Sequence, residues 1–268
     1  MSEHPPRVSI VIPAYNEGEH IVPVLDRLIE AVTLPGEVLV VVDFPEDTTV
    51  PAVQKYGLHG HLSVRVAVSD FGRGPANAIR FGIHSAKAPV VVVTMADGCD
   101  DPRQIDELTR LVERGVVVAA ASRYMPGGQQ VGGELVKRTL SRNAGRSLYW
   151  LAKVGTRDAT NSFKAYDRDF VERVGIESRD GFEIGLELTA KARRMRLPVA
   201  EIPTIWLDRP AGDSNFKVGK WLPKYLRWYR FAYGPRLEVP ERHDALAPSS
   251  NTAGTTASPQ PDTTEKSS

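Results

Sequence analysis

The chain has 268 residues, of which 41% are hydrophobic and 25% charged, so it holds enough apolar material for one globular domain with a sizeable core. Its formal net charge of +1 gives no overall electrostatic reason to expect binding to nucleic acid or another polyanion. Cys99 is the single cysteine, which excludes a disulfide framework within the chain and a cysteine-based zinc site.

The first half of the chain alternates between short apolar runs and segments of helical periodicity. The runs are rich in β-branched residues and predict buried strands, and the apolar spacing after each of the first four runs predicts a helix. This alternation is typical of an α/β fold, so we expect a mostly parallel sheet flanked by helices on both faces. The predicted strands cover residues 8–12, 37–43, 62–68, 90–94 and 116–121.

The second half of the chain has a less regular pattern. Glycines dominate residues 125–133, which predicts a flexible loop, and residues 134–154 predict a long helix that carries several cations. Pro203 predicts an edge strand or a bulge, because proline cannot donate a ladder hydrogen bond. The remaining predicted elements are a turn and short strand at 158–166, a helix at 182–195 and an extended segment at 199–207.

A basic and aromatic segment, residues 216–233, ends the part of the chain that predicts structure. It contains several Lys, Arg, Trp and Tyr residues and no acid, a composition that suits a bilayer interface. The alternative is a C-terminal helix that packs its aromatic rings on the core and leaves its cations in solvent. Aromatic residues are absent from 236 onward, so we expect one domain over residues 1–235 and a disordered tail over 236–268.

An acidic turn follows the predicted strand at 90–94 and contains Asp97, Asp100 and Asp101. Ligands of open α/β sheets bind outside the carboxyl ends of the strands, where carboxylates can hold a divalent cation and, through it, a phosphate. Asp101 is explained as the cap of a helix that begins at Pro102. For Asp97, a metal ligand and a plain turn residue are equally good interpretations of these residues alone.

Polar residues also follow the first two predicted strands. Tyr15 and Glu17, in the turn at 13–17, suit a nucleotide base or ribose, and a plain turn with Asn16 as a cap is the alternative. Asp43 ends the second strand, where a carboxylate suits a ribose hydroxyl or a base N–H group, although it also suits an ordinary turn.

The glycine-rich segment at 72–77 follows the third predicted strand, not the first, and matches neither a dinucleotide fingerprint nor a P-loop. This disfavours a Rossmann dinucleotide site. A pyrophosphate lying against Arg73 is one interpretation of the segment, and a close-packed turn is the simpler one.

Taken in order, these motifs resemble those of the inverting family 2 glycosyltransferases, and most of all the dolichol-phosphate mannose and glucose synthases. The resemblance runs from Arg7 to Tyr233. It includes Pro-Ala-Tyr-Asn-Glu at 13–17, Met-Ala-Asp-Gly-Cys-Asp-Asp-Pro at 95–102, Ala-Ser-Arg-Tyr-Met-Pro-Gly-Gly at 121–128, Arg-Asp-Ala-Thr-Asn-Ser-Phe-Lys-Ala-Tyr at 157–166, Asp-Gly-Phe-Glu at 180–183, and Asp208-Arg209 with Gly-Asp-Ser-Asn at 212–215.

The resemblance implies a GT-A fold and inverting transfer of a sugar from a GDP- or UDP-sugar to a polyprenyl phosphate of the dolichyl or undecaprenyl type. It implies Mg²⁺ or Mn²⁺ on the donor diphosphate, held by Asp97, with Asp97, Asp100, Arg123 and Arg209 as the residues closest to the chemistry. By position it assigns the nucleoside to Pro13, Tyr15, Glu17 and Asp43, the donor phosphates to Arg209 and the Ser214-Asn215 loop, and the acceptor phosphate to Arg123 with Lys137, Arg138 and Ser141. The positive charges of Arg73 and Lys217 add these two residues to the candidates for the donor phosphates.

The chain departs from the family pattern at several positions. Met95 stands where the family has the first Asp of D-x-D, which leaves Asp97 as the motif's one carboxylate and Asp100 as a candidate replacement. The family's D-D-x-S becomes Asp-Phe-Pro-Glu at 43–46. Asn215 replaces the basic residue of the G-x-S-K loop, and Ser162 and Lys164 replace the Gly and Arg of S-G-F-R.

The chemistry of the acceptor decides which residues the reaction needs. A lipid monophosphate is already an anion at neutral pH, because its second pKa is about 6, so it needs positioning and no general base. A sugar hydroxyl needs a base, for which Asp100 and Glu183 are the candidates. The alternatives to a lipid-phosphate acceptor are a family 2 transferase with a non-lipid acceptor and a nucleotide-sugar-binding protein without turnover.

No apolar run approaches the roughly 18–20 residues that cross a bilayer, and residues 1–7 lack the apolar stretch of a signal peptide. These features predict a protein that is soluble or lies on a membrane without crossing it. Together with the resemblance, they lead us to expect a cytoplasmic protein that is peripheral on the cytoplasmic membrane face and binds no nucleic acid.

Overall fold

The computed structural model describes residues 5–208 and 218–241 of the chain. The predicted site residues Arg209, Ser214, Asn215 and Lys217 lie outside the described residues, as does the predicted tail from residue 242 onward.

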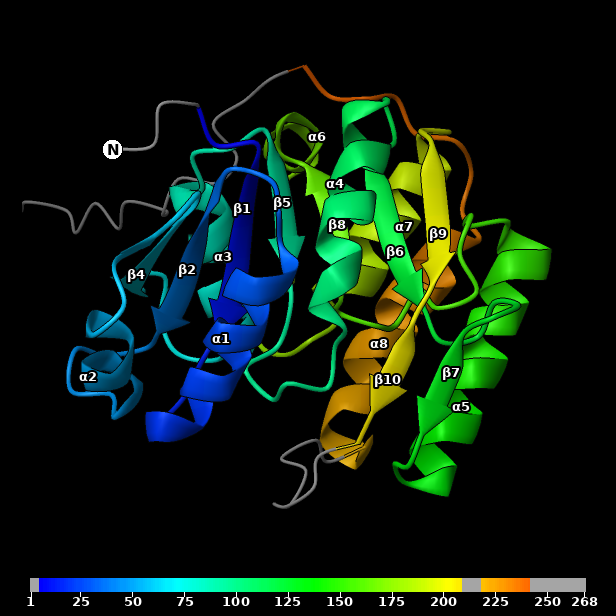
Figure 1. The fold of residues 1–268 in the computed structure, drawn as a ribbon. Coiled ribbons are helices and arrows are strands. Elements are labelled where there is room, and N and C mark those ends of the chain that lie inside the picture. Colours follow the sequence, from blue (N-terminus) through cyan, green and yellow to red (C-terminus); the bar gives the residue numbers. More distant parts are fainter. Residues whose placement is uncertain (1–4, 209–217, 242–268) are drawn as a thin grey trace, which may run out of the picture.

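One eight-stranded sheet forms the centre of the described chain, in the order β3-β4-β2-β1-β5-β8-β6-β9 (Figure 1). Strands β4, β2, β1 and β5 run parallel, as do β6 and β9, whereas β3 and β8 are antiparallel to their neighbours. The mostly parallel α/β sheet predicted from the sequence is therefore confirmed. The strands are β1 Val8–Pro13, β2 Gly36–Val42, β3 Leu58–His59, β4 Leu62–Val68, β5 Val90–Val93, β6 Val118–Ser122, β8 Lys164–Asp167 and β9 Val199–Pro203.

A second, two-stranded parallel sheet pairs β7 (Gln129–Val131) with β10 (Ile205–Leu207). The expectation of a flexible loop over residues 125–133 is therefore wrong for β7. The strand gave no signal in the sequence because it is short and polar, and its partner is remote along the chain. Strand β9 lies at the edge of the large sheet and ends at Pro203, as the proline predicted.

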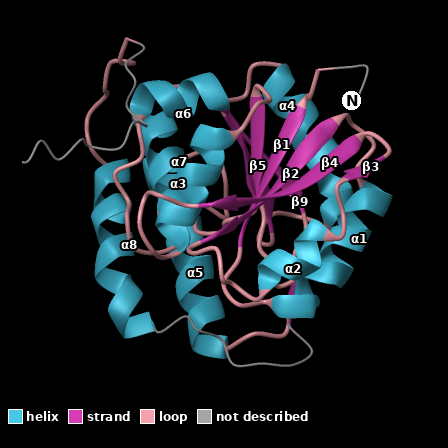
Figure 2. Cartoon of the chain, turned by 90° about the vertical axis from the view of Figure 1, so that its left-hand side faces the viewer, coloured by secondary structure: helices cyan, strands magenta, loops and turns pink. Residues whose placement is uncertain are grey.

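Helices cover both faces of the large sheet, as Figure 2 shows. The apolar strands serve both layers, because alternate residues point to opposite faces: Ile10 and Ile12 pack with α1, α2 and α4, whereas Val11 packs with α3, α6 and α7. The helices on the sheet are α1 Val22–Ala31, α2 Thr49–Gln54, α3 Pro75–Ser85, α4 Ile105–Glu113, α6 Arg168–Val174 and α7 Ile184–Arg194, with short 3₁₀ turns η1 Gly18–Ile21 and η2 Pro102–Gln104.

The two predicted cationic helices form a third layer. Helix α5 (Leu135–Ser147) continues into a single π-helical turn, η3 (Leu148–Ala152), and α8 (Val218–Ala232) packs against η3 and α7. Trp228 of α8 is 2% exposed and donates from Nε1 to Ser178 Oγ at 3.0 Å. The packing alternative for the basic and aromatic segment is thus correct for this face of α8. Within the described ranges, no helix is both long and apolar enough to span a membrane.

The directions of the strands place the candidate site. The carboxyl ends of β1, β2, β5 and β6 meet at one edge of the large sheet, with the β7–β10 pair, α5 and α8 around the same end of the molecule (Figure 1). Strand β8 runs the other way, so its amino end reaches this edge between β5 and β6. The described turns that follow β1, β2, β5 and β6, and the loop that precedes β8, therefore lie at the same edge.

We expect Trp228→Ala to destabilise the protein by about 3–5 kcal/mol, because it deletes a fully buried indole that joins α8 to the core. Trp150, which is 68% exposed at η3, provides the matched control. Trp150→Ala should change the free energy of unfolding by no more than about 0.5 kcal/mol. Equilibrium urea denaturation measures both, and equal destabilisation by the two variants would contradict the docking of α8.

Candidate active site

A cleft of about 1330 Å³ lies at this edge of the sheet. Its walls come from the turns after β1, β2, β5 and β6, from the start of α3, and from α5, β7, β10 and α8. The predicted site residues that line it are Pro13, Tyr15, Glu17, Asp43, Arg73, Asp97, Asp100, Arg123, Arg138 and Ser141. Lys137 lies in α5, and its side chain is outside the described part of the structure.

The two turns that carry the predicted nucleoside residues are tied together by one buried aspartate. Asp47, 1% exposed, accepts from the backbone N–H of Asn16 at 2.9 Å and of Thr49 at 2.8 Å. Thr49 Oγ1 in turn accepts from the N–H of Glu17 at 3.0 Å. Asp47 is not among the site residues predicted from the sequence, although an Asp two residues before a Thr at a helix start is a signal for such a turn.

The rim of this end of the cleft is aromatic and cationic. The Tyr15 ring is 61% exposed and meets Phe44 edge-on at a centroid distance of 6.0 Å. The guanidinium of Arg73 lies 5.9 Å from the same Phe44 ring. Asp43 accepts from the N–H of Gly74 at 3.0 Å, which fixes the start of α3 beside the end of β2. An exposed ring next to a held carboxylate suits recognition of a nucleoside.

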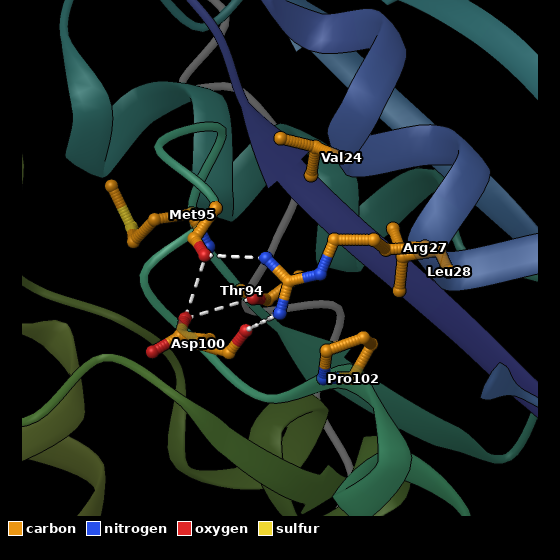
Figure 3. Close-up of a pocket in the computed structure, with 8 residues that line it drawn as sticks. Val24, Arg27, Leu28, Thr94, Met95, Asp100 and Pro102 are labelled. Carbon is orange, nitrogen blue, oxygen red and sulfur yellow. Dashed lines mark hydrogen bonds between the residues drawn. The ribbon is translucent and has the colours of Figure 1, made fainter. Parts of the chain in front are cut away.

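The acidic turn after β5 is shown in Figure 3. The Asp100 carboxylate, 8% exposed, accepts from Thr94 Oγ1 at 2.8 Å and from the N–H of Met95 at 3.3 Å. From α1, Arg27 donates to the carbonyls of Gly98 at 2.7 Å and Asp100 at 3.3 Å. The turn is therefore held from both sides. Arg27 is not among the predicted site residues, because its two acceptors are backbone carbonyls, which have no sequence signature.

The three aspartates of this turn have different environments. Asp97 lines the cleft and accepts from the N–H of Cys99 at 3.0 Å, and Asp101 accepts from the N–H of Arg103 at 3.1 Å, which confirms its predicted role as a cap. Burial, reinforced by the nearby charge of Asp97, raises the pKa of Asp100 to about 7. Asp100 is therefore partly protonated at neutral pH, whereas Asp101 has its pKa lowered by the hydrogen bond from Arg103.

A buried cluster of charges lies at the other end of the cleft. Asp158 is fully buried and accepts from Arg123 three times, from the backbone N–H at 3.0 Å, Nε at 2.7 Å and Nη2 at 2.9 Å. Burial opposes the charged carboxylate, but Arg123 and Lys164 together hold the pKa of Asp158 below its usual value. Burial lowers the pKa of Lys164, and the charge of Asp158 opposes this effect. The guanidinium of Arg123 lies 5.0 Å from the Tyr124 ring and 6.0 Å from the Trp206 ring.

Helix α5 meets this cluster through Ser141, whose Oγ lies 2.7 Å from Thr160 Oγ1. Arg138, one turn earlier on α5, also lines the cleft. Glu183, one of the two candidate bases, is 3% exposed and is not among the cleft-lining residues, whereas Asp100 is. The geometry therefore brings Asp100, and not Glu183, to the cleft.

The side chains available as metal ligands limit the kind of metal ion that fits the cleft. Among the described residues, no group of three or more His, Cys, Asp and Glu side chains is placed to hold a metal ion. Asp97 offers a carboxylate on the cleft wall close to the buried Asp100. This arrangement suits Mg²⁺ or Mn²⁺ that takes most of its ligands from water and a bound diphosphate, and it does not suit a metal held by protein alone.

The fold and the order of the motifs define a family. The sequence pattern described as "Glycosyl transferase family 2" matches residues 9–175, which is more than half of the chain. The protein therefore belongs to glycosyl transferase family 2 and is a glycosyltransferase enzyme.

Two characterised relatives share about the same extent of this chain. Polyprenol monophosphomannose synthase of Mycolicibacterium smegmatis is 29% identical over 230 residues, which cover 80% of this chain and 86% of that protein. Dolichol-phosphate mannosyltransferase of Pyrococcus furiosus is 30% identical over 226 residues, which cover 82% of this chain and 62% of the relative. The chain thus spans less than two thirds of the length of the Pyrococcus protein.

Solved structures share the fold at lower identity. Glucosyl-3-phosphoglycerate synthase from Mycobacterium tuberculosis, in complex with Mn²⁺, UDP and glucosyl-3-phosphoglycerate, matches with a TM-score of 0.60 and 17% identity over 87% of this chain and 81% of that chain. A crystal structure of a mycobacterial protein matches with a TM-score of 0.62 and 18% identity, over 87% of this chain and 76% of that one. The present chain therefore has a GT-A fold.

We expect Asp100→Asn to remove a pH-dependent destabilisation. A carboxyl whose pKa is raised on folding binds its proton more tightly in the folded state. Its contribution to the free energy of unfolding therefore falls as pH rises from about 4 to about 7. The stability difference, variant minus parent, should therefore grow between pH 5 and pH 8, by at most about 1.4 kcal/mol per pH unit. Urea denaturation of the metal-free proteins measures it.

Asp101→Asn is the matched control for this prediction. The pKa of Asp101 is lowered in the folded protein. Its carboxylate therefore stabilises the fold fully at any pH above its pKa in the unfolded chain, and this stabilisation is lost only on acidification. Its stability difference from the parent should stay flat between pH 5 and pH 8. A flat difference for Asp100→Asn as well would show that Asp100 titrates normally.

Proposed function

We propose that the protein transfers a sugar, with inversion, from a GDP- or UDP-sugar to a polyprenyl phosphate at the cytoplasmic membrane face. The observation that carries the proposal is the arrangement of the cleft. Nucleoside-type contacts lie at one end, Asp97 lies on its wall, and Arg123 and Arg138 line the end next to α5. The two relatives named above, a polyprenol monophosphomannose synthase and a dolichol-phosphate mannosyltransferase, support the same class of acceptor.

On the donor side, Pro13, Tyr15, Glu17 and Asp43 bind the nucleoside, and Arg73 lies against the phosphates. Asp97 holds Mg²⁺ or Mn²⁺, which when bound neutralises the charge that the leaving diphosphate gains. The Mn²⁺ and UDP in the structurally similar synthase support a divalent cation and a nucleotide of this kind. Arg209, Ser214, Asn215 and Lys217, which lie outside the described residues, would contact the donor phosphates as the family resemblance implies.

On the acceptor side, Arg123 is held in one orientation by Asp158 through Nε and Nη2. Together with Arg138, Lys137 and Ser141 it would bind the acceptor phosphate. A phosphate monoester is an anion at neutral pH, so its oxygen attacks the anomeric carbon without a general base. Asp100, whose pKa burial raises to about 7, has the pKa of a general base at neutral pH, but an acceptor phosphate would not need one. A single displacement of this kind inverts the anomeric configuration.

The surface next to the cleft favours a lipid. Leu135 and Val136 at the start of α5 are 67% and 64% exposed, and Leu140 and Leu222, which line the cleft, are 47% and 44% exposed. Exposed apolar side chains beside the cations of α5 and α8 suit the boundary between lipid headgroups and acyl chains. We therefore place this end of the molecule on the membrane.

A soluble phosphorylated acceptor is the second candidate. It is favoured by the lack of a membrane-spanning helix among the described residues and by the fold shared with a synthase whose product is glucosyl-3-phosphoglycerate. Both acceptors present a phosphate monoester that Arg123 would bind, but a phosphoglycerate would attack through its hydroxyl and would need a general base, for which Asp100 lines the cleft. The two acceptors also differ in what would lie next to Leu135 and Val136, which is a lipid surface for the polyprenyl phosphate and solvent for the soluble acceptor.

The first test measures transfer of labelled sugar from a panel of GDP- and UDP-sugars to detergent-dispersed polyprenyl phosphate, with Mg²⁺ or Mn²⁺ present. We expect label in the organic phase with one donor. Asp97→Ala should lower the rate by a factor of about 10²–10³, the usual effect of losing one transition-state electrostatic contact. The cap variant Asp101→Asn is the control and should keep most of the activity.

A parallel reaction replaces the lipid with 3-phosphoglycerate. Label that stays in the aqueous phase as a glycosylated product, with none in the organic phase, would refute the lipid acceptor and establish the soluble one.

The second test measures sedimentation with vesicles of anionic lipid. We expect Leu135→Ser to weaken binding about tenfold or more, because burying one leucine side chain contributes roughly 1.5–3 kcal/mol. Val239, 38% exposed and outside α5 and α8, provides the control, and Val239→Ser should bind as the parent does. Equal binding by Leu135→Ser and the parent would remove this end of α5 from the membrane contact.

A further inference from the structure

Lys164 is a fully buried lysine that the donor and acceptor assignments leave unused. It is 0% exposed and opens β8, where its backbone lies beside Val93 of β5 and Ala120 of β6. A buried ammonium costs several kcal/mol unless its donors are satisfied. The contacts of the ammonium group must therefore account for its position between β5 and β6.

The ammonium group is surrounded by the carbonyls of the loop that precedes β8. Lys164 Nζ donates to Asp158 O at 3.2 Å, to Ala159 O at 3.3 Å and to Asn161 O. An ammonium has three hydrogens, so these three acceptors use its full capacity. The loop of residues 158–162 thus turns around one side chain.

Helix α7 closes the other side of this arrangement at a glycine. A Cβ at Gly185 would lie 2.9 Å from Asn161 O and 3.3 Å from Lys164 Nζ. A larger residue there would push on both the carbonyl and the ammonium, so the absence of a side chain lets α7 seal the group away from water.

The same loop forms part of the acceptor end of the cleft. Residues 160–162 line it, the Asp158 carboxylate orients Arg123, and Thr160 Oγ1 lies 2.7 Å from Ser141 Oγ of α5. Asn161 Nδ2 also donates to Ala121 O of β6 at 3.0 Å. Lys164 itself is not among the cleft-lining residues, so it reaches the acceptor end only through the loop.

We propose that Lys164 is a positioning residue: by binding three carbonyls of the loop 158–162, it holds that loop against Arg123 and Ser141 in the geometry that receives the acceptor phosphate. The proposal rests on the assignment of the acceptor to this end of the cleft. It predicts that loss of the ammonium affects the acceptor and spares the donor, since the nucleoside contacts come from β1, β2 and their turns.

The test compares Lys164→Met with Lys191→Met. Lys191, 4% exposed, is a second buried lysine, and its Nζ donates to Val174 O at 3.2 Å, Gly175 O at 2.9 Å and Glu187 Oε1 at 2.7 Å, away from the cleft. Both variants lose a satisfied buried ammonium and should melt at lower temperature. Lys164→Met alone should raise the KM of the acceptor tenfold or more, with the donor KM changed less than about twofold.

Hydrogen exchange supplies a readout that does not depend on transfer. In Lys164→Met the amides of residues 158–162 should exchange at least tenfold faster, while those of β1 and β2 stay as protected as in the parent. Lys191→Met should leave 158–162 unchanged. If Lys164→Met does not fold, Gly185→Ala replaces it, because its added Cβ displaces the Asn161 carbonyl while Lys164 is retained.

Two outcomes would overturn the proposal: unchanged exchange at residues 158–162, or equal rises in the donor and acceptor KM. The acceptor KM is measured with whichever phosphate acceptor the parent uses, lipid or soluble. If the parent transfers to neither, the proposed function fails and the exchange experiment alone decides whether Lys164 holds the loop.

Discussion

The acceptor end of the cleft depends on the charge of Asp158. This carboxylate is fully buried, and an unpaired charge in that position would cost several kcal/mol, so Arg123 must stay beside it, with the charge of Lys164 as further support. Arg123 follows β6 and Lys164 opens β8, which run in opposite directions. One buried charge therefore fixes the relative position of two strands, a loop and the guanidinium that faces the cleft.

The sequence was enough to predict the half of the site that is local in the chain. Tyr15, Asp43 and Asp97 each follow a strand that an unbroken apolar run revealed, and parallel strands bring their carboxyl ends together at one edge. The strand pattern alone therefore predicts that these polar residues lie close to one another, and the cleft contains all three. The cap at Asp101 was predictable for the same reason, since its partner is two residues away.

The rest depended on contacts between remote residues. Arg27 reaches the acidic turn through backbone carbonyls, which carry no sequence signal, and β7 finds its partner β10 only in the folded chain. Trp228 was counted in a segment that suits a membrane, but its indole is buried on α7, because amphipathic composition does not say which surface the apolar face covers. Glu183 matched a family block and yet lies off the cleft.

The direction of β8 has a consequence for how the two proposed substrate regions are arranged along the chain. Since this strand is antiparallel, the segment that we propose for the acceptor precedes it, while the segments that we propose for the donor follow β1, β2 and β5. A change in residues 159–162, with Asp158 kept, therefore leaves the register of the parallel strands unshifted. The two proposed substrate regions are thus separable in the chain, because one lies before an antiparallel strand and the other after parallel ones.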